Sequence, residues 1–333
     1  MKLSILIPFK NVEKYIRTCL LSIINSINYA NCFHSVNYEI VLLDDDSEDK
    51  SMSIAQHTLK DHYNYKDNRV YRFVTSEVTG FDAVRNTLWK ESEDSNLIIF
   101  IDSDDWISNT YIYNHLNKHL VHPEISASQV ANISQFKDNS YIEIQHLGVC
   151  AQVCKLNELF PSMVENDTCI TPVVWTKMIN RQHLANDKRY PYFYMDGLND
   201  SFFTFTHFQL LDTIAIFEDE HGGVFRRYNR ENSYMDSLRK SKAGERYIKL
   251  IDAILNHYIK YDYSNNIYLP FQFLNLAIVM GNNRTPLLVK DYLLKNKEKL
   301  SKFINPHSIN ALENICKLVD PVNLCSFRGI LCN

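Results

Sequence analysis

Short apolar runs alternate with longer amphipathic segments through the first hundred residues of the chain. The apolar runs are typical of strands and lie at 3–7, 38–43, 70–74 and 97–101. The segments between them have the period of a helix and lie at 12–27, 49–65 and 81–91. Strands that alternate with helices are typical of crossover units, so we predict a mostly parallel sheet flanked by helices.

The pattern changes after residue 108. Alternating runs at 126–136 and 141–147 predict antiparallel strands. Helices are predicted at 108–119, 175–184 and 198–211, and beyond residue 236 at 243–260, 267–280 and 286–303. We therefore expect an α/β domain over 1–235 and a helical C-terminal region over 236–333.

Composition narrows the class of protein. The 333 residues are 45% hydrophobic and 22% charged, which is typical of a globular protein. The formal net charge of -4 argues against a nucleic-acid partner, which would require a basic surface. Pro8 interrupts the first apolar run too early for a secretion signal, and 267–280 is too short to cross a bilayer. A cytoplasmic location is the expectation.

Acidic side chains follow two of the predicted strands. Asp44 and Asp45 come directly after the strand at 38–43, and Asp102 and Asp104 after the strand at 97–101. Ligands of an open parallel sheet bind outside the carboxyl ends of its strands. We therefore expect the two acidic groups to converge on one crevice.

Carboxylates packed this closely repel one another, so a cation is expected beside them. Mg²⁺ and Mn²⁺ take oxygen ligands, and substrate phosphates commonly complete their coordination. The alternative is that Asp104 or Asp105 caps the helix that follows Trp106. The apolar strand before the motif and the second acidic cluster favour the metal site. A dinucleotide-binding site is disfavoured, because no glycine-rich turn follows the first strand.

Four segments, in matching order over about the first 110 residues, resemble glycosyltransferase family 2. They read SILIPFKNVEKYIRTCLLSI, EIVLLDDDSEDKS, TGFDAVRN and IIFIDSDDWIS. The resemblance implies a GT-A, Rossmann-like fold, in which 1–106 bind a nucleotide sugar and 107–235 form the acceptor side. It also implies a metal-dependent, inverting enzyme of the hexosyltransferase type, with a UDP-sugar as the usual donor. The likeness weakens over 120–235 and is not visible beyond about residue 240.

The resemblance also implies roles for individual residues. Those near the base, ribose, phosphates or donor sugar would be Pro8, Phe9, Asn11, Glu13, Asp44, Asp45, Asp82, Arg85, Asp102 and Ser103. Arg85 would pair with a phosphate, since a guanidinium forks onto oxyanions, although a surface salt bridge is an equally common fate. Asp104, the last residue of the family's DXD motif, would ligate Mn²⁺ or Mg²⁺.

Three positions depart from the family pattern. Lys10 replaces the usual Tyr, Asp46 the usual Gly, and Asp82 the usual Ser. Asp46 must either tolerate a left-handed backbone or sit in another kind of turn. None of the three touches the metal motif, so they bear on donor preference rather than on reaction type.

Inverting transfer needs a carboxylate that takes the proton from the acceptor hydroxyl. In the family this residue commonly closes a Glu-Asp pair at the start of a helix, downstream of Trp-x-Lys. Residues 174–178 (VWTKM) resemble the Trp-x-Lys segment. Residues 197–203 (GLNDSFF) resemble the Glu-Asp pair, with Asn in place of Glu. Asp200 is therefore the predicted base. Asp196 is an alternative candidate for the base. For both residues the other interpretation is a purely structural role as a helix cap, because both precede a helical pattern.

Residues 221–233 (HGGVFRRYNRENS) resemble the family's flexible segment that folds over the donor. His221 or Arg230 would reach the diphosphate or the metal, unless this is an exposed loop with solvated arginines. Trp106 and Trp175 offer an apolar face for a sugar ring, or belong to the core.

The function expected from these motifs is transfer of a sugar from a nucleotide diphosphate sugar to a hydroxyl of a glycan or lipid-linked acceptor, in surface polysaccharide synthesis. A nucleotidyltransferase and a non-catalytic nucleotide-sugar-binding module are the alternatives. The former would carry a glycine-rich basic loop after the first strand, which is absent. The lysine-rich segment 290–302 is open to three interpretations: peripheral contact with an anionic membrane on the cytoplasmic face, a solvated helix face, or packing in a homo-oligomer.

Overall fold

The computed structural model describes 1–63, 70–137, 140–146, 152–156, 171, 173–184, 193–194, 198–207, 211–228, 243–261 and 285–302. The described residues up to 228 belong to one compact unit, and the described helices from 243 onward belong to a second.

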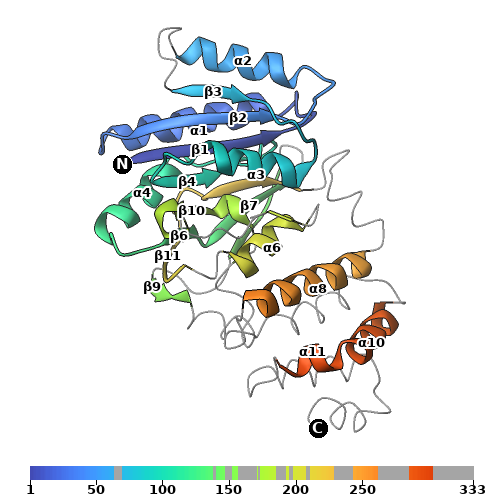
Figure 1. Ribbon diagram of the computed structural model, residues 1–333. Coiled ribbons are helices and arrows are strands. Elements are labelled where there is room, and N and C mark those ends of the chain that lie inside the picture. Colours follow the sequence, from blue (N-terminus) through green and yellow to red (C-terminus); the bar gives the residue numbers. More distant parts are fainter. Residues whose placement is uncertain are drawn as a thin grey trace. The chain divides into compact units, whose positions relative to one another are not determined.

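The first unit begins with the predicted alternation of strands and helices (Figure 1). The strands are β1 (Lys2–Phe9), β2 (Asn37–Asp44), β3 (Tyr71–Val74) and β4 (Leu97–Phe100), and the helices are α1 (Ile16–Asn31), α2 (Ser51–His62) and α3 (Phe81–Glu91). The strands pair in parallel in the order β3-β2-β1-β4. Strands β1 and β4 are almost wholly buried, as expected where helices cover both faces of a sheet.

Beyond β4 the sheet becomes mixed and continues as β10-β6-β11-β9. These strands are β6 (Ala127–Val130), β9 (Gln152–Lys155), β10 (Lys177–Asn180) and β11 (Thr213–Phe217), while helix α4 spans Tyr111–Val121. A second, four-stranded sheet has the order β5-β12-β7-β8, with β5 at Trp106–Ile107, β7 at Asn132–Lys137, β8 at Ser140–His146 and β12 at Val224–Arg227. The predicted α/β class, with a large central sheet flanked by helices, is confirmed.

The helix predicted at 175–184 is wrong. This segment forms short 3-10 turns at Val174–Thr176 and Arg181–His183 on either side of β10. Strand β10 is antiparallel to both β4 and β6, with Met178 opposite Ile99. Without it, β4 and β6 would each leave a row of backbone groups unpaired inside the protein, and this long-range pairing outweighs a weak local helical period.

The later helices match the prediction in part. Helix α6 (Asn199–Thr206) is shorter than the predicted 198–211, and α8 spans Ala243–Tyr261. The helix predicted at 286–303 is two helices, α10 (Thr285–Lys295) and α11 (Lys297–Ser301). The helix predicted at 267–280 lies outside the described residues. Among those residues, no helix has the length and apolar character needed to cross a membrane.

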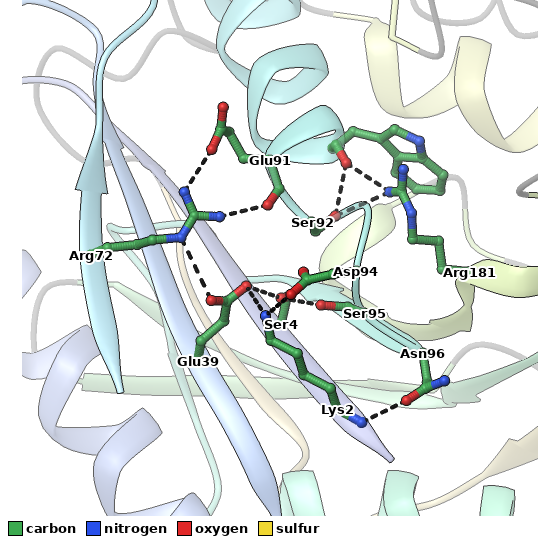
Figure 2. Close-up of polar contacts among 11 residues, drawn as sticks. Lys2, Ser4, Glu39, Arg72, Glu91, Ser92, Asp94, Ser95, Asn96 and Arg181 are labelled. Atoms are coloured by element: carbon green, nitrogen blue, oxygen red, sulfur yellow. Dashed lines mark hydrogen bonds and ion pairs between the residues drawn. The ribbon is translucent and has the colours of Figure 1, made fainter. Parts of the chain in front are cut away.

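A polar network with a buried centre at Ser4, Glu39 and Ser95 ties the amino ends of the strands together (Figure 2). Ser4 Oγ on β1 donates to Glu39 Oε1 on β2 at 2.7 Å and lies 2.6 Å from Ser95 Oγ. The Glu39 carboxylate also pairs with Lys2 at 3.1 Å and with Arg72 on β3 at 3.6 Å. The polar side chains at this edge therefore satisfy one another.

The same network anchors the C-terminal end of α3. Arg72 Nη1 pairs with Glu91 Oε2 at 2.6 Å. Arg181 Nη1 donates to the Trp89 carbonyl at 2.7 Å and to Ser92 Oγ at 3.1 Å (Figure 2). Since these contacts fix one end of α3 to the sheet, they also fix the direction of its other end.

Candidate active site

The loops that follow β1 and β2 are hydrogen-bonded to each other. Asn11 accepts from the backbone N–H of Glu48 at 2.8 Å, and Glu13 accepts from that of Lys50 at 3.1 Å. Asn11 and Asp46 have left-handed φ angles of 49° and 56°. Asp46 thus takes the strained alternative foreseen for a residue that replaces glycine.

Asp44 and Asp45 lie half-buried at the carboxyl edge of the sheet. Asp44 Oδ1 accepts from the backbone N–H of Ser47 at 3.0 Å and shapes its own turn. Asp45 Oδ1 accepts from the N–H of Gly80 at 2.8 Å, directly before α3. Gly80 has a φ of 108°, which side-chain-bearing residues rarely adopt. Asp45 therefore holds the start of α3 at this edge.

Three carboxylates gather after β4. Asp102, Asp104 and Asp105 each offer an oxygen, and these oxygens all lie within 4.8 Å of one another. Burial raises the pKa of the Asp102 carboxyl, although Arg85 opposes the shift. Burial and the neighbouring Asp104 raise the pKa of Asp105 well above its usual range. This acidic triad is thus a concentration of negative charge that the protein only partly offsets.

Arg227, on β12, supports the triad from the second sheet. Its backbone N–H donates to Asp105 Oδ1 at 2.8 Å, and its Nη1 donates to the Asp104 carbonyl. Its guanidinium carbon lies 4.3 Å from the ring centroid of Trp106 and 4.9 Å from that of Tyr15. Arg227 was not predicted from the sequence, because only the pairing of β12 with β5 brings it to the motif.

Arg85 lies behind the triad and is only 1% exposed. Its Nη2 donates to Asp102 Oδ1 at 2.8 Å, and its Nη1 makes an ion pair with Asp200. The Phe81 ring lies 4.4 Å from the guanidinium carbon. This burial rules out an ordinary surface salt bridge and makes Arg85 a bridge between the predicted metal motif and the predicted base.

Asn199 extends this arrangement to α6. Its Oδ1 accepts from Arg85 Nη1 at 3.0 Å, and its Nδ2 donates to Asp82 Oδ1 at 2.8 Å. Asp200 lies in the first turn of α6, whereas the cap position is Leu198, so Asp200 does not cap this helix from that position. Asp196 lies outside the described residues.

The sequence model described as Glycosyl transferase family 2 matches residues 4–228. The chain belongs to this family. Over 111 residues it is 35% identical to the glycosyltransferase GlyA of Streptococcus pneumoniae, a match that covers 33% of the chain and 14% of GlyA. The minor teichoic acid biosynthesis protein GgaA of Bacillus subtilis is 28% identical over 348 aligned positions, which cover 92% of the chain and 67% of GgaA.

A crystal structure of TarS from S. aureus in complex with UDP-GlcNAc shares the fold. The two structures align with a TM-score of 0.57 and 18% sequence identity, over 99% of this chain and 88% of the TarS chain. The chain spans only a small part of the length of GlyA, 14%.

The remaining residues predicted from the family motifs are placed as follows. Pro8 and Phe9 are buried at the end of β1, and Ser103 is buried within the acidic triad. His221 is exposed in the turn before β12, and Arg230 lies outside the described residues. Trp175 is 4% exposed and belongs to the core, whereas Trp106 is partly exposed. Contacts of these residues with a nucleotide sugar stay predictions.

Proposed function

We propose that this family 2 enzyme transfers a sugar, with inversion, from a UDP-sugar to a hydroxyl of a growing cell-surface glycan. The observation that carries the proposal is the shared buried arginine: Arg85 contacts both Asp102 of the acidic triad and Asp200. UDP-GlcNAc in the TarS complex supports a UDP-sugar donor, and the name of GgaA supports a role in making a cell-surface polymer.

The acidic triad fits a divalent cation. Its ligand atoms are all carboxylate oxygens, which suit Mn²⁺ or Mg²⁺, and their mutual repulsion would fall on binding. Asp104 would hold the ion, with Asp102 close to the donor sugar or ribose. A bound cation would supply positive charge against the diphosphate as it leaves.

The chain's own residues would position the donor and activate the acceptor. Asp45 accepts from the N–H of Gly80 before α3, and Asp82 lies in the first turn of α3. Both are proposed to face the nucleotide. Asp200 would take the proton of the acceptor hydroxyl while that oxygen bonds to the anomeric carbon and the bond to the diphosphate breaks. The ion pair with Arg85 would keep Asp200 charged and oriented for this step.

Two substitutions test the assignment, with UDP binding measured by calorimetry and UDP release measured over a panel of UDP-sugars. Asp104→Ala is expected to remove Mn²⁺-dependent UDP binding. Asp200→Asn is expected to keep that binding and to lower transfer by about a thousandfold. Unchanged transfer by Asp200→Asn would refute the role of this residue.

The same assays separate the alternatives. A nucleotidyltransferase would release pyrophosphate from a nucleoside triphosphate. A binding module would bind UDP-sugars without turnover. A cytoplasmic location, membrane contact by the lysine-rich helices and self-association stay predictions.

A further inference from the structure

A groove of about 600 Å³ runs along one side of α1 within the first unit. Its other walls are β5, the residues that follow it, and the turn before β12. None of the described residues that line it is a lysine, arginine, aspartate or glutamate. Its exposed polar groups are the hydroxyl of Thr18, the amides of Asn25 and Asn109, and the imidazole of His221.

Aromatic side chains lie at both ends of this α1 groove. At one end Trp106 and Phe225 stack, with ring centroids 5.4 Å apart and planes at 10°. At the other end is Tyr29, whose ring packs against Phe33 at 5.2 Å. The Phe33 side chain is 57% exposed, so this aromatic surface continues outside the groove.

The walls of the groove are held rigidly. Ser108 and Thr110 donate to the buried Asp219 at 2.7 and 2.8 Å. Gly222, with a φ of 100°, leaves no room for a side chain, because a Cβ there would lie 2.8 Å from the Phe225 ring. By contrast, the exposed amides of Asn25 and Asn109 make no side-chain hydrogen bond to another described residue. The groove thus presents free amides between fixed aromatic walls.

The groove adjoins the acidic triad. Trp106 directly follows Asp105, and Phe225 lies two residues before Arg227, whose backbone N–H bonds to Asp105. On the α1 side, Cys19 Sγ lies 3.7 Å from the Asp102 carbonyl. A chain lying in the groove would therefore lead toward the candidate active site.

We propose that the α1 groove binds a neutral oligosaccharide segment of the acceptor, away from the hydroxyl that reacts. Sugar rings have apolar faces that pack on aromatic side chains, and their hydroxyls pair with amides and an imidazole. The lack of cations in the lining disfavours phosphate-rich polymers and nucleotides, which are recognised through arginine and lysine. That the bound saccharide belongs to the acceptor rests on the proposed function, whereas the binding of a saccharide in the groove does not.

The test uses the full chain and an array of neutral oligosaccharides, with a polyol phosphate oligomer as the anionic comparison. The wild-type protein is expected to bind a neutral oligosaccharide of several units. The double variant Asn25→Ala/Asn109→Ala is expected to bind it about tenfold more weakly or worse, because its amides are lost. The control is Asn28→Ala, an exposed asparagine on the same helix outside the groove lining, which should bind like the wild type.

UDP binding with Mn²⁺ and donor hydrolysis are measured on the same samples, so the two proposals can fail separately. If these activities are intact but no neutral glycan binds, the groove proposal is overturned alone. Equal affinity of the double variant and the wild type, or a preference for the polyol phosphate, overturns it as well. Oligosaccharide binding that depends on Asn25 and Asn109, in a protein without transferase activity, would instead refute the proposed function and leave the saccharide site standing.

Discussion

The two ends of the parallel strands carry polar networks of opposite character. At the amino ends every carboxylate drawn in Figure 2 has a basic partner: Glu39 has Lys2, Glu91 has Arg72, and Asp94 has Lys2. At the carboxyl ends one arginine, Arg85, is shared between carboxylates on two different elements, and the acidic triad keeps an excess of negative charge.

The difference indicates a structural role for the amino-end network and a functional role for the carboxyl-end cluster. A network whose groups satisfy one another needs no ligand, and it stabilises the fold by fixing its elements. Repulsion and burial raise the pKa values of the Asp102 and Asp105 carboxyls, so a bound cation would stabilise their charged forms, and such clusters are common at functional sites. Helix α3 connects the two, since its C-terminal end is held by the first network and its first turns carry Asp82 and Arg85.

The largest expected effect is the difference in kcat between two matched arginine substitutions, one in each network. Arg85→Lys keeps the charge but cannot reach Asp102 and Asp200 together, because lysine lacks the planar fork. We expect kcat to fall by about a hundredfold to a thousandfold with little change in the affinity for UDP and Mn²⁺. Arg72→Lys, in the amino-end network, should leave kcat within about threefold of the wild type. Equal losses in the two variants would contradict the comparison.

Removing an anchor of α3 should reduce stability more than chemistry. Arg181→Met leaves the Trp89 carbonyl and Ser92 Oγ without their charged donor in a buried place. We expect the free energy of unfolding, measured with denaturant, to fall by about 3 kcal/mol. The folded fraction should retain most of its activity. A variant as stable as the wild type would show that the amino-end network does not hold the helix.

The sequence predicted the position of the acidic triad well, because the triad is local in the chain. Strand β4 is a continuous apolar run, and the acidic triad follows it directly in the chain, so the pattern alone placed the motif at a strand end. The burial of Arg85 is also indicated by the pattern of apolar residues around it. Leu88 and Trp89 follow Arg85 at spacings of three and four residues and are buried with it, which places Arg85 on the inner face of α3.

Other parts could not be predicted because they depend on pairing between distant segments. Strand β10 exists through its register with β4, about 80 positions earlier in the chain, and its own periodicity resembles a helix. Arg227 reaches Asp105 only because β12 lies beside β5. Pairings of this kind are set by the assembled sheet, and no local pattern in 174–184 or 224–227 indicates them.

A buried histidine outside both networks tests which groups make the fold sensitive to acid. His119 of α4 is 7% exposed, and burial lowers the pKa of its imidazole to about 4. The hydrogen bond to the Met178 carbonyl opposes this shift, and the nearby His183 adds a smaller lowering effect. An unfolded histidine has a pKa near 6.5, so the unfolded state gains the proton first, and stability present above this pH is lost as the pH falls toward 4. The loss attributable to His119 should reach about 2 kcal/mol near pH 5. His119→Gln cannot titrate, so the difference between its unfolding free energies at about pH 7.5 and about pH 5 should be smaller than that of the wild type by this amount. If the two proteins lose equal stability, acid sensitivity arises from other groups, with the paired carboxylates of the amino-end network the first to examine.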